Sequence, residues 1–468
     1  MRIFNYLSRQ IEEFRPIRRN DVGMYTCGPT VYDFAHIGHA RTYTFSDILK
    51  RTLEFNGYKV NHVMNITDVG HLTSDADTGD DKIEKTAERE HKSALEIARF
   101  YTDDFFSMLE ALNIKTPQIV CKATDNIPEM IDLIKTLERK GFTYETQDGV
   151  YFDTSKFEEY GILMGKMFES LQKTLRAGAR VEMVPGKRNP TDFALWKFSP
   201  KDSKRQMEWD SPWPAPGRGK VQGFPGWHIE CSAMSMKFLG ETFDIHTGGI
   251  DHVPVHHTNE IAQSEAATGK KFVKYWVEGN HLLVEGEKMS KSLGNFFRVA
   301  DIIEKGFDPI ALRYLYLTAH YRSELNFTWE SLEGAQNALN NLREEISYWD
   351  EAKVGCAEFE KNFKDAISDD LNTPKAIAVM FAMVKSDYPG SAKRKSAEYM
   401  DQVLGLKLSE VKKLELTTEA RELIDKRESF RLKGEFAQAD KVRDELLKMG
   451  IEVEDTSEGS RWRLKNGS

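Results

Sequence analysis

The chain has 468 residues and a net charge of −9, with 40% hydrophobic and 30% charged residues. This balance is typical of a folded globular protein and excludes a disordered, collagenous or fibrous chain. Because the sequence has no run of about 18 apolar residues and no apolar leader, we expect a cytoplasmic protein that does not contact membranes.

Charge is distributed unevenly along the chain. Residues 166–227 include 12 Lys or Arg and six Asp or Glu, so this segment is basic within an acidic protein. A basic segment of this kind could meet a polyanion at one face. Charge alone, however, favours an ordinary solvated surface.

The first part of the chain alternates between strand and helix patterns. Strand–helix–strand order at this spacing predicts the start of a parallel α/β sheet. The expected elements are a strand at 22–26, a helix at 36–55, a strand at 58–65, an acidic loop at 74–81 and one helix at 81–112.

An insertion is expected to interrupt this α/β pattern. A helix at 128–140 precedes a hairpin in which FTYE and VYFD flank Asp148-Gly149. Residues 180–226 are rich in Pro, Gly and Trp and are expected to have little regular structure. The α/β pattern resumes at Gly226, with a helix after Pro254 and extended segments at 272–277 and 281–284.

The last third of the chain is mostly helical. Helices are expected at 312–317, 329–348 and 374–385. The final sixty residues predict two helices separated by Gly434, and a strand-like tail after Gly450. The sequence therefore predicts an interrupted α/β domain, a helical domain and a small α+β module.

His36-Ile37-Gly38-His39 opens the first long helix directly after a strand. Helix N-termini carry unpaired N–H groups and a partial positive charge, so they bind phosphate. His36 and His39 share a helical face and could donate hydrogen bonds to a triphosphate, while Gly38 lets a nucleotide approach closely. Taken alone, the tetrapeptide is equally compatible with two surface histidines that have no function.

A second motif, Lys288-Met289-Ser290-Lys291-Ser292, lies far downstream. Lys288 and Lys291 on a short loop can neutralise charge as pyrophosphate forms. An isolated motif of this type is usually a solvated basic turn. The two motifs in this order, on either side of an interruption in an α/β domain, are much more specific.

With both motifs, the sequence resembles the class I aminoacyl-tRNA synthetases, whose HIGH and KMSKS signatures it contains. The resemblance implies a Rossmann-like domain that activates an amino acid with ATP and transfers it to tRNA. Gly248-Gly249-Ile250-Asp251 resembles the family's glycine–acid segment. The resemblance thus implies nucleotide contacts from Gly38, Gly249, Asp251 and Lys291, although GGID on its own indicates only a turn.

Four widely spaced residues could form a metal site. Cys27 ends the first strand, Cys231 follows the insertion, and His256 and Glu260 share a face after Pro254. Two thiolates, an imidazole and a carboxylate suit tetrahedral Zn²⁺. From spacing alone, buried cysteines and a packed histidine are the better interpretation.

Longer stretches resemble the cysteinyl-tRNA synthetase family: MYTCGPTVYDFAHIGHART, NPTDFALWK, GWHIECSAMS, HHTNEIAQS and KMSKSLGN. The resemblance implies that Cys27, Cys231, His256 and Glu260 hold one Zn²⁺ per chain, which takes the sulfur of the substrate cysteine as a further ligand. Zn²⁺ binds a thiolate well and a serine hydroxyl poorly, so cysteine is selected by bond chemistry. His228 is the best rival ligand. Trp227 is expected to wall the amino-acid pocket and Thr67 to lie near the substrate, whereas Cys121 and Cys356 are expected to be structural.

The resemblance covers nearly the whole chain, including 369–374, 436–446 and 451–463. The implied plan is a first catalytic half at 1–120, a connective insertion at 121–225, a second catalytic half at 226–307, a stem-contact and helical anticodon-side domain at 308–400, and an anticodon-binding module at 401–468. Two segments depart from the family pattern: residues 69–79 intervene before Asp80-Asp81-Lys82, and Trp213–Phe224 is longer than usual.

The expected activity is that of a cysteine–tRNA ligase. Cysteine and ATP, with Mg²⁺, give cysteinyl-adenylate and pyrophosphate, and the cysteinyl group moves to the 3′ end of tRNA(Cys). His36, His39, Lys288 and Lys291 stabilise charge, and a monomer is expected. One alternative is a ligase that joins cysteine to a small amino sugar, as in mycothiol synthesis, although residues 369–463 argue against it. Another is a non-catalytic RNA-binding paralogue, against which the intact HIGH and KMSKS motifs argue.

Overall fold

A computed structural model of the chain describes residues 1–69, 72–74, 78–170, 185–201, 204–289, 294–350, 354–413, 416–456 and 459–464. Its centre is a five-stranded sheet in the order β14-β13-β3-β4-β7, in which all neighbouring strands are parallel. The strands are β3 (Asp21–Thr26), β4 (Lys59–Ile66), β7 (Ile119–Lys122), β13 (Phe243–Gly249) and β14 (Val273–Gly279).

The insertion separates two groups of strands that rejoin in this sheet. β3, β4 and β7 precede it in the sequence, whereas β13 and β14 follow it. The connecting helices include α1 (Ile37–Phe55), α4 (Ile127–Arg139), α6 (Trp227–Leu239) and α7 (Thr258–Thr268), and the strand and helix expected at 22–55 are confirmed. The predicted Rossmann-like α/β fold is confirmed as well.

The single helix expected at 81–112 is wrong. The structure has α2 (Lys82–Glu90) and α3 (Ala94–Ala111), because His91 adopts a left-handed conformation and Ser93 begins a new capping box with Glu96. The acidic loop expected at 74–81 is also wrong, since β5 (Leu72–Ser74) and β6 (Thr78–Asp81) form an antiparallel pair.

The hairpin expected in the insertion is confirmed, whereas residues 180–226 contain more regular structure than their composition predicts. Its antiparallel sheet has the order β11-β12-β10-β9-β8, with β8 (Thr143–Glu145), β9 (Gly149–Phe152), β10 (Phe193–Phe198), β11 (Trp209–Asp210) and β12 (Gln222–Pro225). All six residues of β10 are buried, so this strand has no alternating pattern to detect. Residues 171–184 lie outside the described residues.

A second small sheet follows the parallel sheet and leads into the helices. It has the order β16-β15-β17, formed by β15 (Leu282–Val284), β16 (Glu287–Lys288) and β17 (Leu325–Phe327). The helices are α8 (Val299–Glu304), α9 (Pro309–Leu317), α10 (Trp329–Ser347), α11 (Ala357–Ile367), α12 (Thr373–Val384) and α13 (Gly390–Leu404), and they include the three that the sequence predicts.

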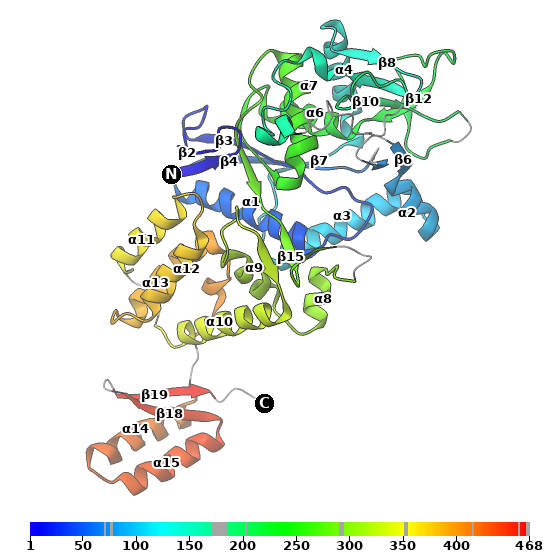
Figure 1. Cartoon of the computed structure of the whole chain (residues 1–468). Helices are drawn as coiled ribbons and strands as arrows, with labels where there is room; N and C mark the ends of the chain where they lie inside the picture. Colours follow the sequence, from blue (N-terminus) through cyan, green and yellow to red (C-terminus); the bar gives the residue numbers. More distant parts are fainter. Residues whose placement is uncertain are drawn as a thin grey trace.

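The C-terminal module has a hydrophobic core of its own. It comprises α14 (Thr418–Leu432), α15 (Phe436–Lys448) and the hairpin β18 (Ile451–Thr456) and β19 (Gly459–Leu464). Figure 1 shows this module apart from the main body, at the red end of the chain. Its buried residues are Ala420, Ile424, Val442, Leu446, Ile451 and Val453.

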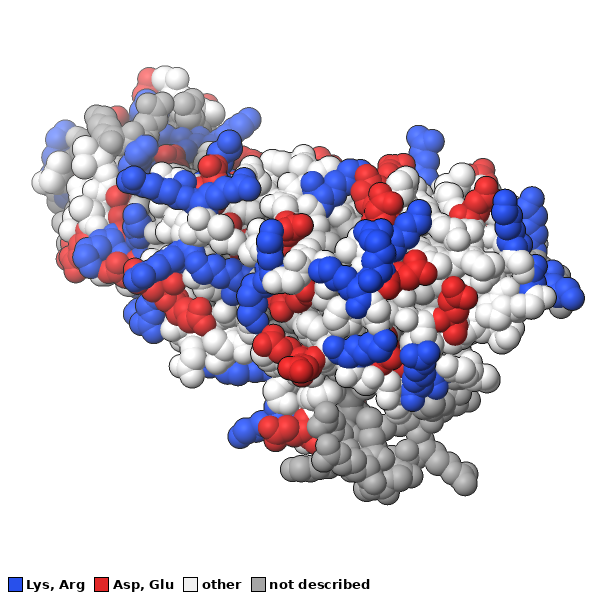
Figure 2. Space-filling view, turned by 90° about the horizontal axis from the view of Figure 1, so that it is seen from above, with Lys and Arg blue, Asp and Glu red and all other residues white. Residues whose placement is uncertain are grey.

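Basic and acidic side chains are mixed over the face of the molecule that Figure 2 shows. Charge alone therefore does not mark this face as a nucleic-acid surface. Within the described ranges, no helix is both long and apolar enough to cross a membrane.

Candidate metal centre and nucleotide site

The candidate site lies where the strand order of the parallel sheet changes direction. From β3 the chain proceeds outward through β4 to β7, and later from β13 outward to β14. In open α/β sheets, ligands bind at such a switch point, beyond the carboxyl ends of the strands. Cys27 directly follows β3, and Gly248 and Gly249 end the neighbouring β13.

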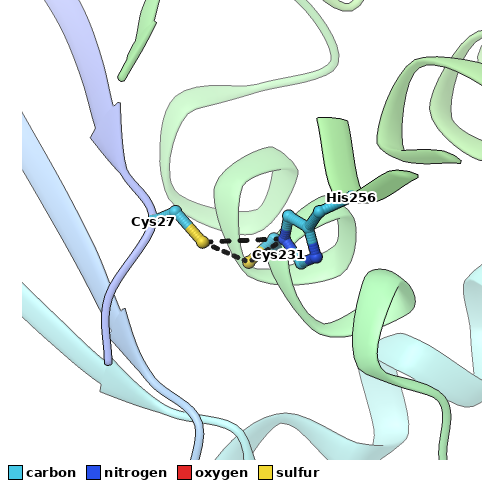
Figure 3. A group of neighbouring side chains, drawn as sticks. All are labelled: Cys27, Cys231 and His256. Carbon is cyan, nitrogen blue, oxygen red and sulfur yellow. Dashed lines mark hydrogen bonds between the residues drawn. The ribbon is translucent and has the colours of Figure 1, made fainter. Parts of the chain in front are cut away.

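Cys27, Cys231 and His256 come together in a buried group at this edge (Figure 3). The two sulfur atoms lie 3.8 Å apart, and Nε2 of His256 is 3.6 Å from Sγ of Cys27 and 3.4 Å from Sγ of Cys231. Cys231 is on α6, and His256 belongs to a single π-helical turn, Val253–His257, before α7. These three donors could hold a metal ion.

Glu260 stands beside this group on α7. Its Oε1 lies 3.1 Å from Nε2 of His256, yet this buried oxygen accepts no hydrogen bond within the described residues. Its Oε2 lies 3.0 Å from Nε2 of His246. A cation among the sulfurs and His256 would give Glu260 Oε1 a partner, so the donor set fits a tetrahedral metal ion.

Burial and mutual charge set the protonation of these groups. Burial raises the pKa of Cys231 well above its usual value. The hydrogen bond to Cys231 lowers the pKa of Cys27, but burial and nearby carboxylates raise it overall. Burial acts to lower the pKa of His256, yet the charges of Cys231 and Glu260 raise it to about 10. Because a metal binds thiolates, metal binding must release protons from this site.

Further histidines lie close to this group. Nδ1 of His228 lies 3.1 Å from Nδ1 of His256, which leaves Nε2 of His256 facing the sulfurs. His228 thus contacts a metal-ligand candidate, rather than the sulfurs. His246, which the sequence analysis missed, forms a second group of donors with His257 and Glu260. Its position inside a buried strand carries no pattern that distinguishes it from a packed residue.

Thr67 and Trp227 both lie near the metal group. The Thr67 hydroxyl donates to Oε2 of the fully buried Glu230 over 2.8 Å, and Asn65 Nδ2 donates to Thr67 Oγ1 over 3.1 Å. The ring of Trp227 is half-buried, with its centroid 4.4 Å from that of His256. The sequence analysis gave no role to Glu230, which follows His228 and Ile229 on the same helix as Cys231.

The two histidines of HIGH form the N-terminal cap of α1. Nδ1 of His36 accepts hydrogen bonds from the N–H groups of Gly38 and His39, and Nδ1 of His39 lies 3.3 Å from the His36 N–H. The rings stack with centroids 3.7 Å apart. These contacts leave Nε2 of each ring to carry the proton of the neutral imidazole.

The segment that leads to Lys288 and Met289 approaches this N-terminal cap of α1. A Cβ added to Gly38 would lie 2.5 Å from Cε of Met289, so glycine lets the Met289 side chain approach this cap closely. The N–H of Ile37 donates to the carbonyl of Phe297 over 2.9 Å. Lys288 is exposed at the end of β16, whereas Lys291 lies outside the described residues.

Gly249 and Asp251 lie together at the end of β13. A Cβ on Gly249 would be 2.4 Å from Oδ1 of Asp251, so glycine allows the carboxylate to fold back here. The Asp251 side chain is 59% exposed and lies 4.0 Å from Nε2 of His252. An exposed carboxylate at the switch point could accept hydrogen bonds from a ribose.

Comparison with known proteins agrees with this geometry. The model of the tRNA synthetases class I (C) catalytic domain matches residues 13–337, the DALR domain matches 362–386, and the cysteinyl-tRNA ligase anticodon binding domain matches 414–463. Methionyl-tRNA synthetase of Mycobacterium tuberculosis, solved with methionyl-adenylate, shares the fold with a TM-score of 0.58 at 14% identity, covering 84% of this chain and 93% of that one.

Curated relatives match the chain from end to end. It is 51% identical over 462 residues to cysteine–tRNA ligase 1 of Burkholderia lata, covering 98% of this chain and 96% of the relative. It is 46% identical over 502 residues to cysteine–tRNA ligase of Treponema denticola, covering 99% of each. With the matching catalytic and anticodon-binding models, these relatives show that the chain belongs to the cysteinyl-tRNA synthetase family of class I aminoacyl-tRNA synthetases.

Proposed function

We propose that this chain is a cysteine–tRNA ligase. It joins cysteine to ATP, giving cysteinyl-adenylate and pyrophosphate, and transfers the cysteinyl group to the 3′ end of tRNA(Cys). The observation that carries this proposal is the buried Cys27–Cys231–His256 group at the sheet edge where α1 begins. Amino-acid activation needs a selective pocket next to a phosphate site, and we assign these two roles to the metal group and to the N-terminus of α1.

Cys27, Cys231, His256 and Glu260 are the residues that would hold Zn²⁺. When bound there, Zn²⁺ supplies a strong preference for a thiolate over a hydroxyl. Support comes from the distances between the donors and from the unsatisfied Oε1 of Glu260. Since cysteine and serine are nearly isosteric, pocket volume alone would separate them poorly.

The HIGH histidines act as hydrogen-bond donors. Because Nδ1 of His36 accepts from Gly38 and His39, the neutral His36 ring carries its proton on Nε2 and can donate it to a triphosphate oxygen. His39 is held in the same tautomer by the N–H of His36. Lys288 and Lys291 neutralise the leaving pyrophosphate, so no side chain needs to act as a nucleophile.

The remaining site residues bind substrates. Gly38 and Gly249 leave space for the nucleotide, and Asp251 accepts from its ribose, while Mg²⁺ accompanies ATP. Trp227 walls the amino-acid pocket beside His256, and Thr67 lies near the substrate, with its hydroxyl donating to Glu230. The C-terminal module at 414–463 binds the anticodon side of tRNA(Cys). The monomeric state, the cytoplasmic location and the domain boundaries stay predictions.

Cysteine-dependent exchange of pyrophosphate into ATP, followed by charging of purified tRNA(Cys), tests the proposal. We expect exchange with cysteine, almost none with serine at equal concentration, and transfer to tRNA. Exchange without charging, together with ligation to an amino sugar, would favour the small-amine ligase. Absence of exchange from a zinc-loaded protein would overturn the proposal.

A further inference from the structure

We propose that Arg41 is a positioning residue that sets the place of the lysine arm relative to the HIGH helix. The lysine arm is defined here as residues 280–289, which include β15 and β16 and lead to Lys288. This inference rests on the proposed function, because its consequence is measured as adenylate formation.

Arg41 is a buried cation whose partners are main-chain carbonyls. It lies on α1, two residues after His39, and is only 5% exposed. Nη1 donates to the carbonyls of Asn280, at 2.9 Å, and His281, while Nη2 donates to those of Ser323 and, at 3.4 Å, His320. Within the described ranges, no carboxylate forms an ion pair with it.

The four carbonyls belong to the two segments that build the small sheet. Asn280 and His281 directly precede β15, whereas His320 and Ser323 precede β17, which pairs with β15 in parallel. Asn280 also ties the segments together, because its N–H donates to Tyr321 O over 2.8 Å and its Nδ2 to Arg322 O over 2.9 Å. One guanidinium thus fastens both segments to α1.

The lysine arm begins at Asn280 and His281, the two residues whose carbonyls Arg41 binds. β15 turns at Glu285 and Gly286, both in left-handed conformations, and returns antiparallel as β16, which ends at Lys288. Figure 1 shows β15 beside α1. Because the arm is short, a shift at Asn280 and His281 is transmitted to Lys288.

The geometry requires a guanidinium and not merely a positive charge. Burial lowers the pKa of Arg41 to about 10, so it remains protonated at neutral pH. Its planar fork offers five donors that reach two segments at once, whereas a lysine ammonium is a single point of charge. We therefore expect a lysine at position 41 to preserve the charge and lose the alignment.

Arg51 provides a matched control on the same helix. It is also buried, but it bonds Oδ2 of Asp47 at 2.7 Å and the carbonyls of Asn113 and Gln402, on the side of the helical domain. Arg51→Lys should lower the melting temperature and leave adenylate formation unchanged. Arg41→Lys should lower the single-turnover rate of adenylate formation about 10- to 100-fold, because small misplacements of catalytic groups cost this much.

The decisive experiment is a double-mutant cycle in the zinc-loaded full chain. Arg41→Lys, Lys288→Ala and the double variant are compared for adenylate rate, equilibrium cysteine binding and zinc content. If Arg41 acts through the arm, the double variant should lose much less rate than the product of the two single losses. Cysteine binding and zinc content should stay within about twofold of wild type in every variant.

Provided that the wild-type protein makes adenylate normally, two results would overturn the inference. One is an Arg41→Lys protein that forms adenylate at the wild-type rate. The other is a double variant whose loss of rate equals the product of the two single losses. Should Arg41→Lys fail to fold, Asn280→Ala replaces it in the cycle, since it removes the tie to Arg322 and should give a smaller loss of the same kind. A wild-type chain that makes no adenylate would instead count against the proposed function.

Discussion

Nη2 of Arg313 donates to Oδ2 of Asp47 over 2.6 Å, and both side chains are fully buried. Asp47 lies on α1 and Arg313 on α9, so the pair connects the parallel-sheet domain to the helical region. Arg51 bonds the same oxygen over 2.7 Å, and Arg313 also donates to the carbonyl of Leu404 over 2.7 Å. One carboxylate therefore compensates two buried cations.

Replacing this carboxylate should be costly. We expect Asp47→Asn to lower the free energy of unfolding at pH 7 by about 3–5 kcal/mol, because it leaves buried guanidinium groups without their anion. Urea unfolding measures the change. Asp365→Asn, which removes an exposed partner of Lys361, is the control and should change stability by less than about 0.5 kcal/mol.

The same pair predicts a pH dependence. Burial alone would raise the pKa of Asp47, but Arg313 and Arg51 hold it below its usual value. The stability that this group contributes is therefore present above about pH 4 and is lost as the pH falls through the lowered pKa of the folded state. The difference in stability between wild type and Asp47→Asn should narrow below about pH 4. A constant difference would contradict the assignment.

Metal analysis tests the zinc ligands. Cys231→Ser should lose zinc and cysteine activation, because its sulfur lies 3.4 Å from Nε2 of His256 in the proposed donor set. Cys121→Ser should lose neither, because its thiol donates to the carbonyl of Met64 and does not belong to the group of donors. Cys356→Ser serves as a second control. A metal-free protein with full discrimination against serine would refute the zinc prediction.

Lys291→Ala should affect catalysis much more than binding. In its proposed role, the charge of Lys291 meets pyrophosphate as the bond breaks, so we expect adenylate formation to fall about 100- to 1,000-fold with cysteine binding nearly unchanged. Single-turnover rates beside equilibrium binding separate the two effects. Equal losses in both measurements would argue against a role confined to the transition state.

Thr67→Val should weaken the use of cysteine. The change removes the hydroxyl that donates to Glu230 and leaves a buried carboxyl group without this partner. A loss of this kind costs about 1–3 kcal/mol of folding stability, and because Glu230 is next to the proposed ligand Cys231 on α6, we also expect a raised KM for cysteine in pyrophosphate exchange. Thr67→Ser keeps the hydroxyl and should behave nearly as wild type. An unchanged KM in Thr67→Val would argue against a role of Thr67 in the use of cysteine.

A chain that ends at Lys413 should activate cysteine and charge tRNA poorly. The C-terminal module has its own core, whereas Leu404 and Leu408 are buried in the main body, so the cut must follow them. Gel-shift binding and charging of tRNA(Cys) measure the loss. Charging as efficient as that of the full chain would show that the module does not bind the anticodon.

Local patterns predicted much of the fold. The strand at 22–26 and the helix at 36–55 carry regular apolar periodicity and clear stops, and both are present. The break between α2 and α3 was missed although Ser93 and Glu96 form a capping box, a local signal that could have been detected. In the insertion, the hairpin of β8 and β9 was predicted and is present, but the strands that residues 180–226 add to its sheet were not, because β10 is buried throughout and Gly223 packs against Trp196.

In the candidate site, too, residues within contiguous motifs could be predicted, whereas residues brought together from distant segments could not. HIGH and KMSKS are contiguous motifs, so the sequence alone displays them. Cys27 and Cys231 are 204 residues apart in the sequence, so no local pattern links them. Only the family resemblance predicted that they belong to one site. His246, Glu230 and Arg41 gave no signal, because the partner that explains each buried polar group comes from another segment.

The separation of the two cysteines also determines when the metal centre can assemble during synthesis. β3, which leads to Cys27, emerges from the ribosome early, but its neighbour β13 and the helices α6 and α7 follow the whole insertion. Until Cys231 has been translated, the nascent chain holds Cys27 alone of the proposed donors, and the set is complete only after Glu260. Assembly of the proposed zinc site must therefore wait until the insertion has been translated, and a ribosome stalled within the insertion would leave Cys27 without its proposed partners and open to oxidation.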